Sequence, residues 1–244
     1  MQLYRKQSFY EKWIKRFLDI VCSLMAVIIF GWLYVIIALV VRWKMGAPVI
    51  FRQPRPGCID LKTGKEIIFN LYKFRTMTNA KDENGNLLPD SKRLTSFGIW
   101  LRRSSLDEIP EVLNILKGDM SVIGPRPQLV KDLVFMSDEQ RMRHTVKPGL
   151  SGLAQIMGRN AIGWEEKLSW DLNYIKNISF CNDLKLLWLT FKKVFGHGES
   201  SAELDVTDDY GDYLLKAGKV SQEKYNELQA YARKLLVENS KTGT

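Results

Sequence analysis

The sequence predicts an α+β fold, in which a membrane helix near the N-terminus precedes a small helical domain that contains a β-hairpin. Residues 17–41 are strongly apolar and carry no charge between Asp19 and Arg42. Residues 48–77 are rich in β-branched and aromatic side chains, and most later segments place apolar residues at helical spacing. The chain has 244 residues, which leaves room for one globular domain behind the membrane segment.

The apolar run is long enough to cross a bilayer as a helix, since about 20 helical residues span the hydrocarbon core. It is too long for the core of a secretory signal and lacks an evident cleavage site. Residues 1–16 and 42–55 are both basic, so the preference of Lys and Arg for the cytoplasm selects no orientation. The segment alone fits two arrangements equally: a straight spanning helix, or a re-entrant helix that bends near Gly31 and keeps both ends cytoplasmic.

Charge is unevenly distributed along the chain. Residues 1–198 hold 30 Lys and Arg against 18 Asp and Glu, whereas residues 199–244 hold 6 against 9. A basic core behind a membrane segment suggests binding of anionic lipid, phosphorylated substrates or nucleic acid. The three cysteines show neither disulfide nor metal-site spacing, which favours a reducing compartment.

The middle of the chain is expected to open with a hairpin over residues 48–77, in which residues 52–57, RQPRPG, form an exposed basic turn. A polar loop follows over residues 78–95. Ser105 is expected to cap a helix that ends at Gly118, with Glu108 completing a capping box. Residues 120–127 then read as a short strand followed by a rigid basic turn.

The rest of the chain is predicted to be mainly helical. Helices are expected over residues 128–144, 164–177 and 182–195, the last with an apolar side suited to a membrane surface. The glycine-rich residues 147–160 between them are expected to form a binding loop. In the acidic tail, Ser221 is expected to cap a helix, and the tail helices either mediate a homodimer or cover the core.

Asp107 and Glu108 are the candidate catalytic pair. Carboxylates are common in the first turn of a helix, so capping is the simpler explanation of the pair taken alone. Arg102 upstream and Arg126 downstream favour phosphoryl chemistry, because guanidinium groups bind phosphate oxygens bidentately. One carboxylate could attack phosphorus while the other holds Mg²⁺. Neither histidine of the chain has metal-site spacing, and neither is assigned a role.

The order of the motifs carries a family resemblance. The apolar segment is followed by APVIFRQPRPG, YKFRTM, SLDEIPEVLNILKGDMSVIGPRP and KPGLSGLAQIMGRNAIGWEEKLSWDLNYI. Over roughly residues 10–195 this closely resembles the bacterial sugar transferase family, the small monotopic phosphoglycosyl transferases. The resemblance implies transfer of a sugar-1-phosphate from a UDP-sugar to polyprenyl phosphate, with release of UMP, at the cytoplasmic face of the bacterial inner membrane. Nucleic acid is not expected as a partner of such an enzyme.

Carried over by motif, the resemblance assigns Asp107 as the nucleophile that forms a phosphosugar-aspartyl intermediate, and Glu108 as the ligand of Mg²⁺. The basic positions that it associates with substrate binding are Lys73, Arg102, Arg126 and Arg159. It also divides the chain into a basic flank, a membrane helix, a catalytic domain and an extension, over residues 1–16, 17–41, 42–197 and 198–244.

The chain departs from the family where the membrane helix is expected to bend. Members of the family break this helix at Ser-Pro, whereas this sequence reads Phe30-Gly31-Trp32. Two alternatives to the covalent scheme remain open. One is a membrane-anchored basic module that binds anionic lipid or nucleic acid without catalysis. The other is an enzyme in which the lipid phosphate attacks directly, with Asp107 and Glu108 both serving as metal ligands.

Overall fold

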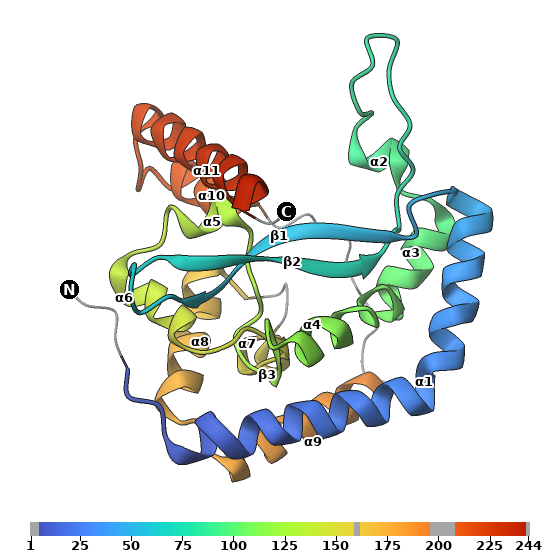
Figure 1. The fold of residues 1–244 in the computed structure, drawn as a ribbon. Coiled ribbons are helices and arrows are strands. Elements are labelled where there is room, and N and C mark those ends of the chain that lie inside the picture. Colours follow the sequence, from blue (N-terminus) through green and yellow to red (C-terminus); the bar gives the residue numbers. More distant parts are fainter. Residues whose placement is uncertain (1–4, 159–161, 196–207, 243–244) are drawn as a thin grey trace.

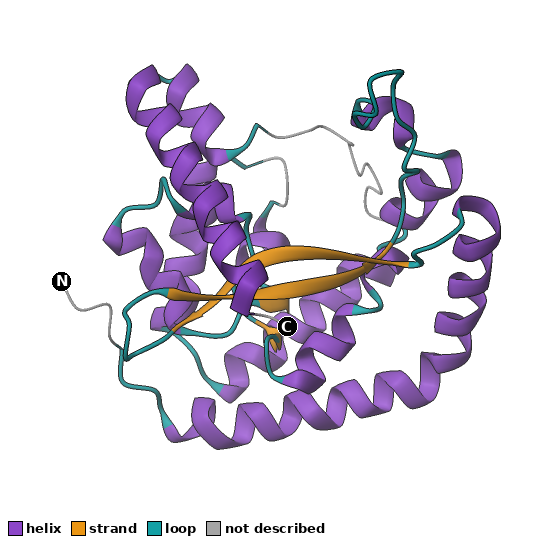
Figure 2. Ribbon diagram, turned by 45° about the horizontal axis from the view of Figure 1, so that its top comes forward, coloured by secondary structure: helices purple, strands orange, loops and turns teal. Residues whose placement is uncertain are grey.

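The structure, a computed structural model, describes residues 5–158, 162–195 and 208–242 (Figure 1). Its first elements are a π-helical turn, Tyr10–Ile14, the long helix α1, Lys15–Met45, and the hairpin strands β1, Ile50–Ile59, and β2, Glu66–Phe74. Helices and two small sheets make up the described part, which confirms the α+β class (Figure 2).

The later elements are mostly short helices around the hairpin. In chain order they are α2 (Asp90–Arg93), α3 (Ser96–Arg103), a 3₁₀ turn (Leu106–Glu108), α4 (Glu111–Lys117), β3 (Ser121–Ile123), α5 (Val130–Leu133), α6 (Asp138–Arg141), a second 3₁₀ turn (Met142–Thr145), β4 (Gly149–Ser151), α7 (Leu153–Met157), α8 (Trp164–Lys176), α9 (Phe180–Phe195), α10 (Tyr210–Lys216) and α11 (Gln222–Thr242).

Helix α1 contacts the domain near both of its ends. Among the described residues, Tyr10–Met45 is the one helix long and apolar enough to cross a membrane. In Figures 1 and 2, α1 runs beneath the domain and then turns up along its side. Arg16 donates hydrogen bonds to carbonyl groups at the end of α4, and Val41 packs in a buried cluster with Phe74 of β2. Between these contacts the middle of the helix is exposed, and Ile28 is 79% accessible, whereas Ser23 and Ile37 on either side of it are buried.

The prediction of an exposed basic turn at residues 52–57 is wrong, because these residues belong to β1 and pair with β2 in an antiparallel register. Both prolines of the segment are tolerated, since β1 is an edge strand. The guanidinium of Arg55 lies inside the protein, where it donates to the Pro127 carbonyl oxygen at 3.2 Å. Burial, together with the nearby Arg126, lowers the pKa of Arg55 to about 10.

The glycine-rich residues 147–158 contain regular structure as well as loop. Strand β4 runs parallel to β3, with Ser121 opposite Gly149. A Cβ on Gly149 would lie 2.1 Å from the backbone nitrogen of Gly124, so no side chain fits where the two segments meet. Close backbone approach therefore accounts for the glycines where β3 and β4 meet.

The tail helices pack on the core of their own chain. This is one of the two alternatives predicted for them; the other is a homodimer. Helices α10 and α11 contact α5 (Figure 1). The Tyr210 N–H donates at 2.9 Å to the buried carboxylate of Asp132, and the Tyr210 ring packs in a cluster with Met136 and Leu168. Ser221 caps α11 as predicted, since its hydroxyl accepts the Lys224 N–H at 3.2 Å.

Helices α8 and α9 lie where the sequence predicts them. Helix α9 buries Leu186 and leaves Leu184 and Trp188 exposed at 54% and 65%. The start of α1 lies beside α9 along the lower edge of the molecule in Figure 1. Their contact is fixed by Lys15, whose ammonium lies 2.5 Å from a carboxylate oxygen of Asp183. Exposed apolar side chains therefore occur on two helices that lie side by side.

Candidate active site

The candidate catalytic pair lies on a 3₁₀ turn instead of the first turn of a capped helix. Ser105 adopts a left-handed conformation with φ of 56° and forms no side-chain cap. Helix α4 starts only at Glu111, after Pro110. The predicted capping box is therefore wrong, because the Glu108 carboxylate turns away from the Ser105 backbone and toward two cations.

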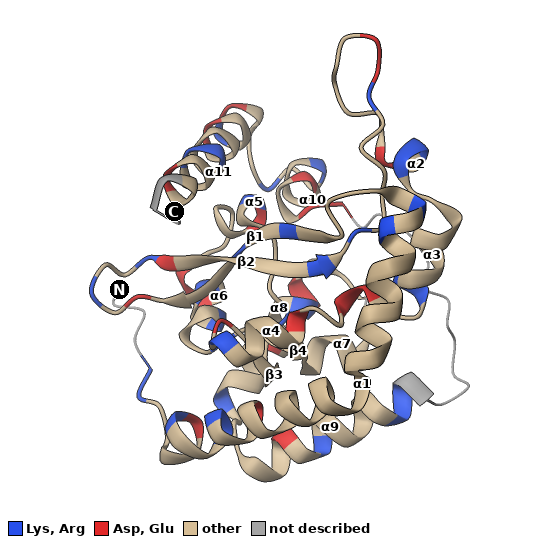
Figure 3. Cartoon of the chain, turned by 45° about the vertical axis from the view of Figure 1, so that its right-hand side comes forward, with Lys and Arg blue, Asp and Glu red and all other residues tan. Residues whose placement is uncertain are grey.

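Glu108 is held between a strand and a turn. Its Oε1 lies 2.7 Å from Nζ of Lys73 on β2, and the same oxygen accepts a hydrogen bond from the guanidinium of Arg126. Figure 3 shows acidic segments around α4 beside the basic end of β2. Burial opposes ionisation, but Arg126 and Lys73 together hold the pKa of Glu108 well below its usual range. Glu108 is therefore an ionised carboxylate with its charge balanced.

Asp107, its neighbour, is in a different electrostatic state. It is 7% exposed, and burial raises its pKa to about 6, a shift that Lys73 opposes and Glu108 reinforces. Its carboxylate is therefore ionised near neutral pH but is poorly solvated and only partly balanced by cations. Adjacent carboxylates with such different pKa values are typical of sites where the two groups do different work.

Glu111 is a site residue that the sequence reasoning missed. It is 1% exposed, and its Oε1 lies 3.3 Å from Nζ of Lys73, which therefore bridges it to Glu108. Burial and the charge of Glu108 raise the pKa of Glu111 to about 7. Its position three residues after Glu108 was the available signal, because that spacing keeps two side chains on one face of a helical turn.

Asn114 fixes the distance between the hairpin and the turn Leu106–Glu108, which is called the catalytic turn below because it carries the candidate catalytic pair. Its Oδ1 accepts the Tyr72 N–H at 3.0 Å and its Nδ2 donates to the Asn70 carbonyl at 2.8 Å. Both contacts are to the backbone of β2, and Tyr72 directly precedes Lys73 on that strand. A fully buried amide thus anchors α4 to the strand that carries the Lys73 ammonium.

A buried ion pair positions the backbone of Arg126. Its backbone carbonyl accepts a hydrogen bond of 2.6 Å from Nη2 of Arg143. The guanidinium of Arg143 also lies 2.7 Å from a carboxylate oxygen of Asp171 on α8, and both side chains are nearly inaccessible. The sequence reasoning assigned this pair no role, although Asp171 lies within the motif KPGLSGLAQIMGRNAIGWEEKLSWDLNYI.

The two remaining predicted basic positions have different outcomes. Arg102 donates from Nε to the Thr76 hydroxyl at 3.0 Å and is close enough to lower the pKa of Asp107. Helix α3 approaches Thr76 so closely that a Cβ on Gly98 would lie 1.9 Å from the Thr76 carbonyl oxygen. Arg159 lies outside the described residues. Of the predicted site, the structure therefore brings together Lys73, Arg102, Asp107, Glu108 and Arg126.

Helix α1 forms one wall behind the catalytic turn. Leu106 and Ile109, which flank the carboxylate pair, pack against the buried cluster formed by Ile37 and Val41 of α1 with neighbours from β2 and α3. The apolar helix and the reactive carboxylates are therefore parts of one packed unit.

The described residues contain no group of three His, Cys, Asp or Glu side chains arranged to hold a metal ion. Mg²⁺ commonly binds one or two carboxylates and completes its shell with water and substrate phosphates. Asp107 and Glu108 fit that mode, because they are adjacent carboxylates on one turn beside basic groups. The ion would thus be held jointly by the protein and a phosphorylated substrate.

Comparison with known proteins gives a consistent result. The family described as bacterial sugar transferase matches residues 10–197. The chain is 48% identical over 181 residues to the uncharacterized sugar transferase EpsL of Bacillus subtilis (strain 168), a match over 74% of this chain and 87% of that protein. It is 37% identical over 194 residues to the galactosyl transferase CpsE of Streptococcus agalactiae, over 74% of this chain and 42% of the relative.

A further relative is the UDP-glucose:undecaprenyl-phosphate glucose-1-phosphate transferase of Escherichia coli (strain K12), 35% identical over 192 residues, or 75% of this chain and 40% of that protein. The chain thus spans most of the length of EpsL but less than half the length of the two larger relatives.

Proposed function

Because the chain belongs to the bacterial sugar transferase family, we propose that it transfers a sugar-1-phosphate from a UDP-sugar to polyprenyl phosphate. The resemblance seen in the sequence and the expected enzyme class, a phosphoglycosyl transferase, are confirmed by the family match and by relatives named as sugar phosphotransferases. The names of two relatives supply the donor and acceptor classes of the proposal. The observation that carries it for this chain is the Asp107–Glu108 turn facing Lys73 and Arg126.

In the proposed first step, a carboxylate oxygen of Asp107 attacks the β-phosphorus, which bears the sugar. A new phosphorus–oxygen bond forms, and the bond from this phosphorus to the bridging oxygen breaks. UMP leaves with that oxygen, and the sugar phosphate stays on Asp107 as an acyl phosphate. Burial keeps the attacking carboxylate poorly solvated, while the pKa of about 6 keeps it ionised at neutral pH.

In the second step, a phosphate oxygen of the lipid attacks the same phosphorus. The bond to Asp107 breaks, the free carboxylate returns, and a polyprenyl-diphospho-sugar is released. This order requires UMP to leave before the lipid reacts, which defines ping-pong kinetics. In the alternative scheme the lipid attacks the nucleotide sugar directly, and no bond to Asp107 forms.

The basic groups supply charge balance in both steps. Arg126 and Lys73 already bind Glu108, so they are positioned to meet phosphate oxygens next to the nucleophile. Mg²⁺, held by Glu108 and the diphosphate, would neutralise charge on the departing UMP. Arg102 and Arg159 are proposed as further phosphate-binding groups.

We place the catalytic domain on the cytoplasmic face of the bacterial inner membrane, with α1 as a re-entrant helix. The long apolar helix and the lipid acceptors named for relatives indicate association with a membrane. Re-entry is supported by the exposed apolar middle of α1, by the turn visible in Figure 1, and by the contacts of both halves with one domain. The exposed apolar side of α9 would lie in the interface.

The proposal is tested by UMP release from a panel of UDP-sugars, with polyprenyl phosphate and Mg²⁺ present. Release from at least one sugar by the native enzyme, and none by Asp107→Asn, is the expected result. Exchange of labelled UMP into the UDP-sugar without acceptor separates the two schemes. Exchange requires the covalent intermediate, so active enzyme that shows neither exchange nor a trapped adduct would establish direct attack instead.

A further inference from the structure

A small cavity lies beside the start of α1, away from the candidate active site. It has a volume of about 140 Å³ and is bounded by the first turns of α1, by β3 and by the segment before β4. The charged side chains that line it are Lys12, Lys15, Arg16, Lys147, Glu11 and Asp19. Nothing in the proposed sugar transfer uses these residues.

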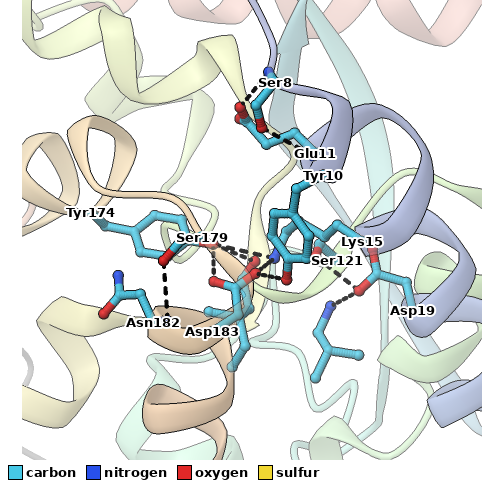
Figure 4. A network of polar contacts seen from close by, with 12 residues as sticks. Ser8, Tyr10, Glu11, Lys15, Asp19, Ser121, Tyr174, Ser179, Asn182 and Asp183 are labelled. Atoms are coloured by element: carbon cyan, nitrogen blue, oxygen red, sulfur yellow. Dashed lines mark hydrogen bonds and ion pairs between the residues drawn. The ribbon is translucent and has the colours of Figure 1, made fainter.

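The acidic groups of the cavity are already bound to other partners. Oδ1 of Asp19 accepts hydrogen bonds of 2.9 Å from the Ser121 hydroxyl and the Val122 N–H. Glu11 is paired with Arg5 and accepts the Ser8 N–H at 2.8 Å. Figure 4 shows the contacts of Glu11 with Ser8 and of Asp19 with Ser121. Glu11 is therefore balanced by Arg5, whereas Asp19 binds only neutral donors and keeps a charge that acts on Lys15 and Lys147.

Lys15 is also paired, but Arg16 and Lys147 are not. Lys15 binds Asp183, as Figure 4 shows. The guanidinium of Arg16 donates only to neutral acceptors, the carbonyl oxygens of Ile115 and Leu116, at 2.6 and 2.8 Å. Across the described ranges neither Arg16 nor Lys147 forms an ion pair, and carboxylates such as Asp19 act on Lys147 only from farther away.

The two unpaired cations converge on one point. Nη2 of Arg16 and Nζ of Lys147 each lie 3.4 Å from the position that a Cβ on Gly118 would occupy. Burial lowers the pKa of Lys147, and the charge of Arg16 lowers it further. Two half-buried cations facing one small cavity attract an anion, and a tetrahedral phosphate can accept hydrogen bonds from both.

The surroundings indicate where that anion comes from. Trp13, in the π-helical turn before α1, and Phe17, in the first turn of α1, are 60% and 65% exposed, and the Lys12 ammonium lies 5.4 Å from the centre of the Trp13 ring. Exposed aromatic and basic side chains at the end of an apolar helix are typical of headgroup depth in a bilayer. A phosphate at this depth belongs to a lipid.

The cavity is separate from the reacting groups. Arg16 binds the carbonyls at the C-terminal end of α4, whereas Asp107 and Glu108 precede its N-terminal end. The seven residues of α4 make a helix about 10 Å long, which lies between the two sites.

We propose that this cavity binds the headgroup phosphate of an anionic phospholipid that is not a substrate. The inference rests on the membrane placement of α1 given under the proposed function. The bound phosphate bridges Arg16 of α1 and Lys147 of the segment before β4, and so ties the membrane helix to the catalytic domain.

The test uses the full chain in bilayer discs that contain equal amounts of phosphatidylcholine and phosphatidylglycerol. The protein is released from the discs, and the lipid molecules that stay bound to it are counted by native mass spectrometry. Native protein is expected to retain phosphatidylglycerol selectively, and Lys147→Gln to retain about fivefold less, the effect of one basic residue near an anionic surface. The matched control is Lys185→Gln, which removes an exposed charge from α9 outside the cavity and is expected to change retention less than twofold.

Three results would overturn the inference. Unchanged retention in both Lys147→Gln and Lys12→Gln would show that the cavity does not select the lipid. An equal loss in Lys185→Gln would show diffuse surface attraction. Displacement of the lipid by millimolar inorganic phosphate would show a free-phosphate site. UMP release is measured on the same discs, so that the two proposals can fail separately. Selective lipid retention without any UMP release would contradict the proposed transferase activity but not the lipid site.

Discussion

The ammonium of Lys73 lies 2.7 Å from a carboxylate oxygen of Glu108 and joins β2 to the catalytic turn. Lys73→Met would remove this cation from a site that also holds Glu111 within 3.3 Å of it. Breaking a buried pair from one side costs about 3 kcal/mol, so we expect a lower melting temperature as well as loss of UMP release. Lys65→Met, in the exposed end of the hairpin, is the control that should change neither. Native-like stability in Lys73→Met would contradict the structural role of this pair.

The pKa of Asp107, about 6, predicts an acid limb in the activity profile. Protonated Asp107 cannot attack phosphorus, so kcat/KM for the UDP-sugar should fall as the pH drops through about 6. In a Glu111→Gln variant the limb should remain, because the proposed nucleophile is Asp107. Disappearance of the limb in that variant would assign it to Glu111, whose pKa is raised to about 7.

The same pKa predicts a stability effect of Asp107→Asn. The folded-state pKa lies above the usual value for Asp, so ionisation of this buried carboxylate destabilises the fold. The cost is absent below the unfolded-state pKa, grows as the pH rises, and is complete above the folded-state value of about 6. We therefore expect Asp107→Asn to be more stable to unfolding than the native enzyme by about 3 kcal/mol near pH 8, and to show no advantage near pH 4. A variant that is less stable near pH 8 would show that the raised pKa is wrong.

The sequence predicted the outline of this site better than its supports. Lys73, Asp107, Glu108 and Arg126 were found because they belong to short motifs, and Arg102 because it lies just before one; the structure brings all five together. The capping-box prediction is wrong because that rule considers only residues within one helical turn. The stronger attraction of Lys73 and Arg126 for Glu108 comes from segments 35 and 18 residues away.

The missed residues share one property, since each supports the site through contacts distant in sequence. Asn114 bonds to backbone groups of β2, and Arg143 bonds to Asp171 and to the Arg126 carbonyl. A buried polar residue looks like any surface polar residue until the partner segment is known. For α1 the sequence left a straight helix and a helix bent near Gly31 both open, because it lacks the proline that marks the bend in the family.

Arg143 offers a test of support at a distance. Arg143→Met would leave the Asp171 carboxylate buried without its partner, at a cost of about 3 kcal/mol or more. The double variant Arg143→Met with Asp171→Leu removes the unpaired charge, so we expect its melting temperature to recover. Its activity should stay low, because the Arg126 carbonyl still lacks its donor and the guanidinium is less well placed. Full recovery of kcat/KM in the double variant would limit Arg143 to a role in stability.

Asp132 tests how the tail is attached. Its buried carboxylate accepts the N–H groups of Tyr210, at 2.9 Å, and Leu129, at 3.1 Å, and so fixes the start of α10 to α5. Asp132→Ala leaves two donors without an acceptor, which costs about 1–3 kcal/mol for each group that stays buried. Because the tail can detach and expose these groups to water, we expect hydrogen exchange in α10 and α11 to accelerate more than exchange in β2. Asp138→Ala, an exposed acid on α6, should leave both rates unchanged. Equal acceleration in β2 and α10 would mean that the tail and the core unfold as one unit.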